Sequence, residues 1–271
     1  SDDDPVRGHG LLAHMLDVAA VAERILQREP PSTLDWICQS LGVDRSGPPA
    51  AERQLAWHVG LHDFGKATIG FQAKWPEGRE RISAAGLPFT HRLLAADRHD
   101  LSSALLLPAR MNRDLACAVA AHHGFHFLPA ELRRSPIVAE PQSWGDARAV
   151  LSAAYDGTLL AGSNIPRLSA DRLAPWNWLA GLTSVADWIG SNTDWFPLGE
   201  RADELALHHA RALDLAEKSS GASSLPVALI LNDDFDRAYA ELAHIYHAER
   251  LKRVRQTWIA PFVKKLTDEA I

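Results

Sequence analysis

The sequence is poor in cysteine and has no long apolar run. Only Cys38 and Cys117 carry thiols among the 271 residues, and both lie in apolar, helix-like stretches without the close pairing of a zinc knuckle. We therefore expect reduced core thiols in a cytoplasmic protein rather than a disulfide framework. No apolar run extends to about 18 residues and no basic leader precedes an apolar segment, so we expect neither membrane insertion nor export.

Excess positive charge is missing as well. The formal net charge is −6, which argues against a free-standing nucleic-acid binder whose affinity depends on neutralising phosphates. It leaves room for a nuclease domain that receives its substrate from another module. One local bias near the C-terminus is basic, and there we expect a solvated helix face. Its members are Arg250, Lys252, Arg253, Arg255, Lys264 and Lys265.

Alternating strand patterns and internal repeats do not occur, and apolar residues recur instead at helical spacing. A hydrophobic content of 46% in a chain of this length is enough to bury a full core. The sequence therefore predicts an all-α fold. Helices are expected over residues 10–29, 51–63, 100–107, 112–123, 146–161, 176–191, 202–217 and 233–251.

Breaks in the helical pattern suggest how the chain is divided. They fall at residues 46–49, 75–78, 128–142 and 219–224, and the last consists of small residues typical of a flexible linker. We predict a disordered N-terminus over residues 1–8 and one helical domain over residues 9–218. A linker-like segment over 219–225 and a C-terminal helical segment over 226–271 are expected to follow.

The most informative motif runs from Leu61 to Lys66, where His62 and Asp63 are adjacent. A neighbouring imidazole and carboxylate can bind two adjacent divalent ions, with the carboxylate bridging between them. Other polar residues lie in apolar helical stretches, where burial requires a compensating interaction. Together they offer five imidazoles and two carboxylates, which are too many for one ion. The candidate ligands are His14, His62, Asp63, His99, His122, His123 and Asp187.

The pair His122-His123 carries a further signal because Gly124 follows it. Neighbours on a helix diverge by about 100°, so both rings can point inward only at a helix end opened by glycine. The remaining histidines have simpler explanations. We predict a structural or supporting role for His58, surface positions on charged helices for His208, His209, His244 and His247, and supporting positions for His9, His91 and His126.

In their order along the chain, these motifs resemble the HD superfamily of metal-dependent phosphohydrolases, an all-helical fold with a metal site at the centre of the bundle. The stretches at residues 14–19, 62–66, 71–74, 98–103, 121–125 and 182–191 are similar to the HD nuclease domain of the type I CRISPR-Cas helicase-nuclease. The similarity extends over roughly residues 9–195.

The resemblance implies a metal-dependent nuclease that degrades single-stranded DNA, the displaced strand of an R-loop opened by an RNA-guided surveillance complex (Cascade). It also implies a helicase domain or subunit as partner, toward which residues 226–271 would lead. One ion would be held by His14, His62, Asp63 and Asp187, and the other by Asp63, His99, His122 and His123. Lys66 would lie near the scissile phosphate and Ser191 near a metal-binding carboxylate.

Two choices stay open at this point. The segment before His91 also resembles the approach to the third histidine in some relatives, although we favour His99 because Asp100 and Ser103 follow it. An HD-type nucleotide phosphohydrolase is the alternative function. Histidine-rich ligation favours manganese, nickel, cobalt or iron over magnesium. Such ions would activate water and polarise the phosphodiester, and Lys66 would neutralise developing charge.

Overall fold

A computed structural model describes residues 9–90, 98–124, 127–134, 140–199 and 204–222. Every regular element in these ranges is helical, which confirms the all-α prediction. None of the helices found there combines the length and apolar character needed to cross a bilayer. The α-helices are α1 (Leu11–Arg28), α2 (Pro31–Leu41), α3 (Ala51–Gly60), α4 (Ile69–Gln72), α5 (Pro76–Ala84), α6 (His99–Leu106), α7 (Arg113–Ala120), α8 (Pro129–Arg134), α9 (Gln142–Leu160), α10 (Leu173–Gly190) and α11 (Leu205–Ala222), and the short 3-10 helices are η1 (Leu61–Lys66), η3 (Leu107–Ala109) and η4 (Ala121–His123).

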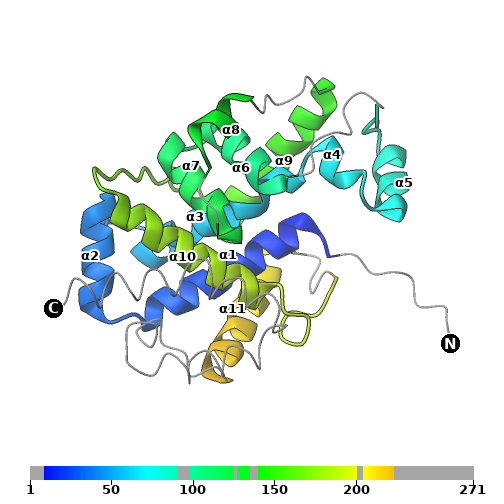
Figure 1. Ribbon diagram of the computed structural model, residues 1–271. Coiled ribbons are helices and arrows are strands. Elements are labelled where there is room, and N and C mark those ends of the chain that lie inside the picture. The colour runs from blue at the N-terminus through cyan, green and yellow to red at the C-terminus, as the bar shows by residue number, and fades with distance from the viewer. Residues whose placement is uncertain (1–8, 91–97, 125–126, 135–139, 200–203, 223–271) are drawn as a thin grey trace.

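Helix α1 crosses the middle of the molecule, with α6, α7 and α8 on one side and α11 on the other (Figure 1). It packs chiefly on α11, α3 and α10. Met15, Leu16 and Val18 are fully buried, as expected for a helix surrounded by others. Burying each such side chain contributes about 1.5–3 kcal/mol. Helix α1 is therefore firmly packed from Met15 onward, and tertiary contacts hold it among its neighbours.

Proline explains two helices that the sequence analysis did not predict. The sequence predicts that the pair Pro30-Pro31 ends the first helix and that Pro76 lies in a break, but Pro31 and Pro76 each occupy the first turn of a helix, α2 and α5 respectively. A proline fits there because its missing N–H would have no partner inside the helix. The predicted end of the first helix is correct, since α1 ends at Arg28. The error lay in treating Pro31 only as a terminator.

The end of the described chain corrects one prediction about the linker. Helix α11 continues to Ala222, so residues 219–222 of the predicted linker are helical. Small residues such as Ser219, which is buried, serve there to pack the helix closely. The predicted helix at 233–251, the basic segment and the N-terminal residues 1–8 all lie outside the described residues.

Cys38 and Cys117 are free thiols, as expected.

Candidate metal centre

Helix α3 and the 3-10 helix η1 place His62 and Asp63 in the interior. The chain tightens from α-helical to 3-10 geometry directly after Gly60, a position at which a Cβ atom would overlap the Tyr155 hydroxyl and the Met15 carbonyl oxygen. Only glycine allows α3 to approach α1 this closely. As a result His62 and Asp63 are 0% and 1% exposed.

The first group of candidate ligands surrounds one oxygen of Asp63. His14 Nε2, from α1, lies 3.0 Å from Asp63 Oδ2 and 3.5 Å from Asp187 Oδ1. His62 Nε2 lies 3.3 Å and 3.4 Å from the same two oxygens. One atom from each of the four side chains falls within 4.8 Å of all the others, which is compact enough for a shared ion.

The second group faces the other oxygen of the same carboxylate. His99 Nε2, from α6, lies 3.2 Å from Asp63 Oδ1, and His122 Nε2, from η4, lies 3.6 Å from it. His123 Nε2 lies 2.9 Å from His99 Nε2, and these three histidines form a second compact group. Asp63 therefore stands between two groups of ligands, with one oxygen directed to each.

The end of α7 brings His122 and His123 together as the sequence predicted. The chain tightens into η4, and Gly124 closes it with a left-handed conformation, φ 91°. Their rings lie 4.2 Å apart at an angle of 46°. The Ser184 hydroxyl donates a hydrogen bond of 2.8 Å to the His122 carbonyl oxygen, so α10 fixes this turn from the other side. Sequence analysis gave Ser184 no such role.

The polar atoms at the centre are suited to a cation. His14 Nε2, both ring nitrogens of His62 and His122, and both carboxylate oxygens of Asp63 are buried without a hydrogen bond of acceptable geometry among the described residues. Leaving such atoms unsatisfied costs about 1–3 kcal/mol each. Lone pairs that converge from imidazoles and a carboxylate are the ligand set of a divalent transition metal, so the residues present fit such an ion.

The electrostatics of the centre keep its carboxylates ionised. Burial alone would raise the pKa of Asp63, but the surrounding imidazoles, His62 first, hold it well below its usual range. The pKa of Asp187 is lowered in the same way by His14 and His62. Burial lowers the pKa of His122 to about 3, aided by the charge on His62, so its ring is neutral. Burial alone would lower the pKa of His62, but Asp63 and Asp187 raise it to about 10, so this ring carries a proton that a bound ion would displace. The ionised carboxylates and the neutral His122 are already in the protonation states that bind metal.

Lys66 and Ser191 lie at the edge of the two ligand groups. The Lys66 ammonium makes an ion pair with Asp63 Oδ2 and lies 5.6 Å from the centre of the Phe71 ring. The Ser191 hydroxyl donates a hydrogen bond of 2.9 Å to Asp187 Oδ1, so the expected proximity of Ser191 to that carboxylate is observed. Gly65 N–H donates to the Ser103 hydroxyl at 2.7 Å and holds α6 against η1.

His58 lies apart from both groups and has a structural environment. Its Nδ1 lies 2.8 Å from the Gln54 carbonyl oxygen, to which it donates, and its side chain is fully buried. Burial lowers its pKa to about 4. The predicted structural role of His58 is therefore consistent with its position. His91, His126, His244 and His247 lie outside the described residues.

The prediction that His208 and His209 lie on the surface is wrong. They are 2% and 4% exposed, because α11 packs this face on α1. His208 Nε2 lies 3.2 Å from Asp17 Oδ1, and His209 Nε2 lies 3.7 Å from Glu23 Oε2. Charged residues elsewhere on α11 suggested exposure, and no local pattern indicated that two carboxylates of α1 would face these rings.

Comparison with known proteins identifies a family that matches most of the described helices. The family described as "Cas3, HD domain" matches residues 1–196. The CRISPR-associated endonuclease/helicase Cas3 of Thermus thermophilus is 37% identical over 231 residues, and the match covers 78% of this chain and 24% of that protein. The chain thus spans about a quarter of the length of this curated relative.

A solved structure gives a matching picture of the fold. The Thermus thermophilus Cas3 HD domain, crystallised in the presence of Ni²⁺, is 31% identical with a TM-score of 0.59, and the match covers 81% of this chain and 86% of that domain. A separate similarity is short: a guanylate kinase of Caulobacter vibrioides is 70% identical over 43 residues, which are 16% of this chain and 20% of that enzyme. A fifth of an enzyme does not reproduce its active site, so this stretch supports no functional statement.

Proposed function

This chain belongs to the Cas3 HD-domain family, and from that premise we propose that it is a metal-dependent nuclease that degrades single-stranded DNA. The observation that carries the proposal is the position of Asp63. Its two carboxylate oxygens face two different groups of histidines, at distances of 3.0 Å to 3.6 Å. A carboxylate between two sets of nitrogen ligands is what a pair of divalent ions requires.

Two transition-metal ions are proposed as cofactors, with manganese, nickel, cobalt or iron favoured by the five imidazoles. When bound, they would polarise the phosphodiester and lower the pKa of a water molecule that attacks it. Asp63 would contribute to both ions. The remaining ligands would be His14, His62 and Asp187 on one side and His99, His122 and His123 on the other.

Lys66 and Ser191 are proposed to support the reaction from the edge of the centre. The Lys66 side chain is 26% exposed, so its ammonium can leave Asp63 and pair with a substrate phosphate. There it would neutralise charge that develops on the phosphate oxygens. Ser191 orients Asp187 through its hydrogen bond, as groups behind a metal ligand commonly do.

Access to the centre favours a single strand. His62 and His122 are buried, whereas His123 and Ser191 are exposed and mark the side open to solvent. A flexible strand can bend a phosphate toward a buried centre that is open on one side, but a duplex is stiff over about 150 base pairs. Phe71 lies 5.2 Å from the His99 ring, and Lys74 lies 5.1 Å from the Phe71 ring. An aromatic ring beside a cation suits base stacking.

The net charge of −6 supports delivery of the strand by a partner rather than capture by this domain alone. We propose a helicase domain or subunit in that role, since the related Thermus thermophilus protein is an endonuclease/helicase. The strand would be the one displaced in the R-loop that Cascade opens during type I CRISPR interference. Cytoplasmic localisation remains part of this proposal.

The direct test is a cleavage assay on purified protein. With manganese, nickel or cobalt it should cut circular single-stranded DNA without strong sequence preference, and EDTA should stop the reaction. The corresponding closed duplex should resist. Asp63→Ala should abolish cleavage because the two cations would repel each other without their shared carboxylate. An Asp63→Ala protein that still cleaves, prepared in parallel to exclude contaminating nuclease, would refute the proposal.

A nucleotide assay separates the alternative function. If nucleoside phosphates are hydrolysed rapidly while single-stranded DNA is left intact, the chain is a nucleotide phosphohydrolase of the same superfamily. Equal rates of cleavage on single strands and duplex would be consistent with a nuclease. They would contradict the inference that access to the buried centre favours a single strand.

A further inference from the structure

We propose that helix α11 sets the metal affinity of the centre through three positioning residues, His208, Asp17 and His9, that connect it to the ligand His14. This inference rests on the proposed metal site and adds a control on it from a helix that carries none of its ligands.

The first turn of α1 is held by few local interactions. Gly10 is its N-cap residue, no side chain caps the helix, and no acidic residue lies in the first turn. Glycine at the N-cap is less stabilising than serine, threonine, asparagine or aspartate by roughly a few tenths of a kcal/mol, so the cap of the described helix start adds little to hold this turn. His14 is held to this turn by its N–H, which donates to the Gly10 carbonyl oxygen at 3.0 Å. The position of His14 therefore depends on tertiary contacts.

Asp17 supplies such a contact one turn after His14. Its carboxylate is 0% exposed and joins two histidines, one before α1 and one on α11. His9 Nε2 lies 2.9 Å from Oδ2, and His208 Nε2 lies 3.2 Å from Oδ1. A carboxylate only accepts hydrogen bonds, so both rings donate from Nε2. Each carboxylate oxygen is thus fixed by a different segment of the chain.

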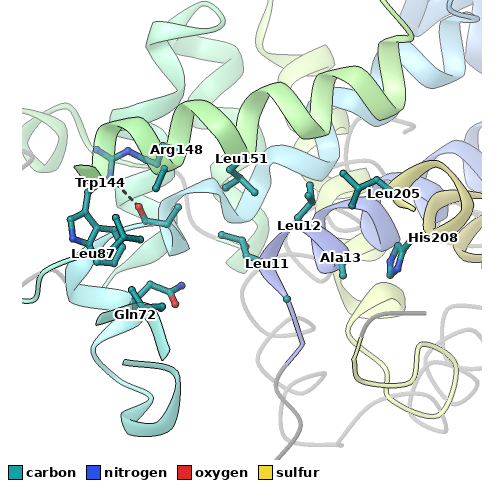
Figure 2. Close-up of a pocket in the computed structure, with 14 residues that line it drawn as sticks. Leu11, Leu12, Ala13, Gln72, Leu87, Trp144, Arg148, Leu151, Leu205 and His208 are labelled. Carbon is teal, nitrogen blue, oxygen red and sulfur yellow. Dashed lines mark hydrogen bonds between the residues drawn. The ribbon is translucent and has the colours of Figure 1, made fainter. Parts of the chain in front are cut away.

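His9 completes the connection to the metal centre. Its ring meets the His14 ring edge to face, with centroids 6.1 Å apart at an angle of 73°. Figure 2 shows a pocket beside this connection, with Leu205 and His208 of α11 near Leu12 and Ala13 of α1. These four residues help to line a cavity of about 460 Å³ that is also lined by Gln72, Trp144 and Arg148. His208 therefore lies where α11 meets the first turns of α1.

Helix α11 also provides a matched control. His209 is buried like its neighbour and faces Glu23, which accepts hydrogen bonds from Arg53 at 2.8 Å to 3.2 Å. Glu23 lies nine residues after His14, about 13 Å farther along α1. Removing His209 should loosen α11 to a similar degree without disturbing the helix start that carries His14.

The experiment is a calorimetric titration of the full chain with Ni²⁺. His208→Leu should weaken binding about tenfold, the low end for residues behind a ligand. His208→Gln, whose amide can still donate to Asp17, should restore affinity to within about twofold of the parent. His209→Leu should bind like the parent while showing a similar loss of melting temperature. His9→Leu should weaken Ni²⁺ binding as much as His208→Leu does. Because His9→Leu leaves α11 unchanged, it provides the test if His208→Leu does not fold.

The outcomes separate this inference from the proposed function. If His9→Leu or His208→Leu binds Ni²⁺ as tightly as the parent, the connection through Asp17 is refuted while the metal site stands. If His208→Leu and His209→Leu weaken binding equally, loose docking of α11 explains the effect and the specific path is wrong. A parent protein that binds no Ni²⁺ would overturn both proposals.

Discussion

His99 occupies the first position of α6, where its Nε2 lies 3.2 Å from Asp63 Oδ1 and 2.9 Å from His123 Nε2. The Phe71 ring packs edge-on against it at 5.2 Å. These contacts agree with the choice of His99 as third histidine on the basis of the residues that follow it. His91, the alternative, lies outside the described residues.

The two histidines should therefore differ sharply on substitution. His99→Ala removes a candidate ligand, and we expect the rate of single-stranded DNA cleavage to fall by more than 100-fold, beyond the 10–100-fold typical of a residue behind a ligand. His91→Ala should lose less than that. Parallel rate measurements at saturating manganese check the ranking, and the reverse order would show that His91 is the ligand.

His58 provides a prediction about pH that does not involve the metal centre. Burial lowers its pKa from 6.5 to about 4, although its hydrogen bond to Gln54 opposes the change. Between these values the unfolded chain binds a proton that the folded chain excludes, so the free energy of unfolding falls as pH decreases. Above about pH 6.5 both states are neutral at this residue and the effect vanishes. The full difference is on the order of 3 kcal/mol.

The matched variant is His58→Asn, whose side-chain amide can replace the Nδ1 donor. Urea unfolding in EDTA, measured at several values between pH 7 and pH 4, should show a shallower loss of stability for His58→Asn than for the parent. If the free energy of unfolding falls equally with pH in both proteins, the assignment of a neutral buried imidazole is wrong. A difference between the two proteins that is constant with pH reflects only the smaller side chain.

Sequence reasoning located the candidate ligands because their chemistry is local. An imidazole beside a carboxylate, or two histidines before a glycine, can be recognised without knowing the fold. The burial of His208 and His209 could not be recognised in this way, because their partners Asp17 and Glu23 lie about 190 residues earlier on another helix. Pairings of this kind depend on tertiary packing and leave no periodic signal.

Helices and their junctions position the centre, and η1 against α6 is the tightest of these junctions. A Cβ atom on Gly65 would overlap the His99 carbonyl oxygen and the Ser103 amide nitrogen. Both are backbone atoms of α6 and cannot turn aside. The absence of a side chain at this position lets η1, with Asp63, approach the helix that begins with His99.

Gly65→Ala should therefore push α6 away from η1. We expect a loss of about 1–3 kcal/mol in the free energy of unfolding, as for other overpacked positions, together with weaker metal binding. Gly181→Ala is the control: Gly181 lies within α10 and a Cβ atom there would meet no heavy atom within 4 Å. It should gain about 0.5–1 kcal/mol. Equal stability of the two variants in chemical denaturation would contradict this account of the junction.

Element boundaries were predictable where the local signal had one meaning. The pattern at residues 10–29 agrees closely with α1 at Leu11–Arg28, because a proline pair follows it. Proline was misleading at Pro76, since the same residue can end one helix or begin the next. The small residues at 219–222 likewise fit either a linker or a helix end, and the structure shows them at the end of α11.

The candidate ligands of the whole molecule come from α1, η1, α6, η4 and α10, and these elements meet on both sides of Asp63. Segments from residue 14 to residue 187 must be folded before the centre exists. Metal should therefore stabilise the folded chain as a whole, because it binds ligands that come together only there. The central claim is that this assembly holds two ions.

The most direct measurement is anomalous diffraction from crystals soaked in excess manganese. We expect two peaks, one among His14, His62 and Asp187 and the other among His99, His122 and His123, with Asp63 between them. Asp63→Ala crystals treated in the same way should lose at least one peak. A single peak in the parent at full occupancy, or peaks that avoid Asp63, would contradict the dinuclear centre.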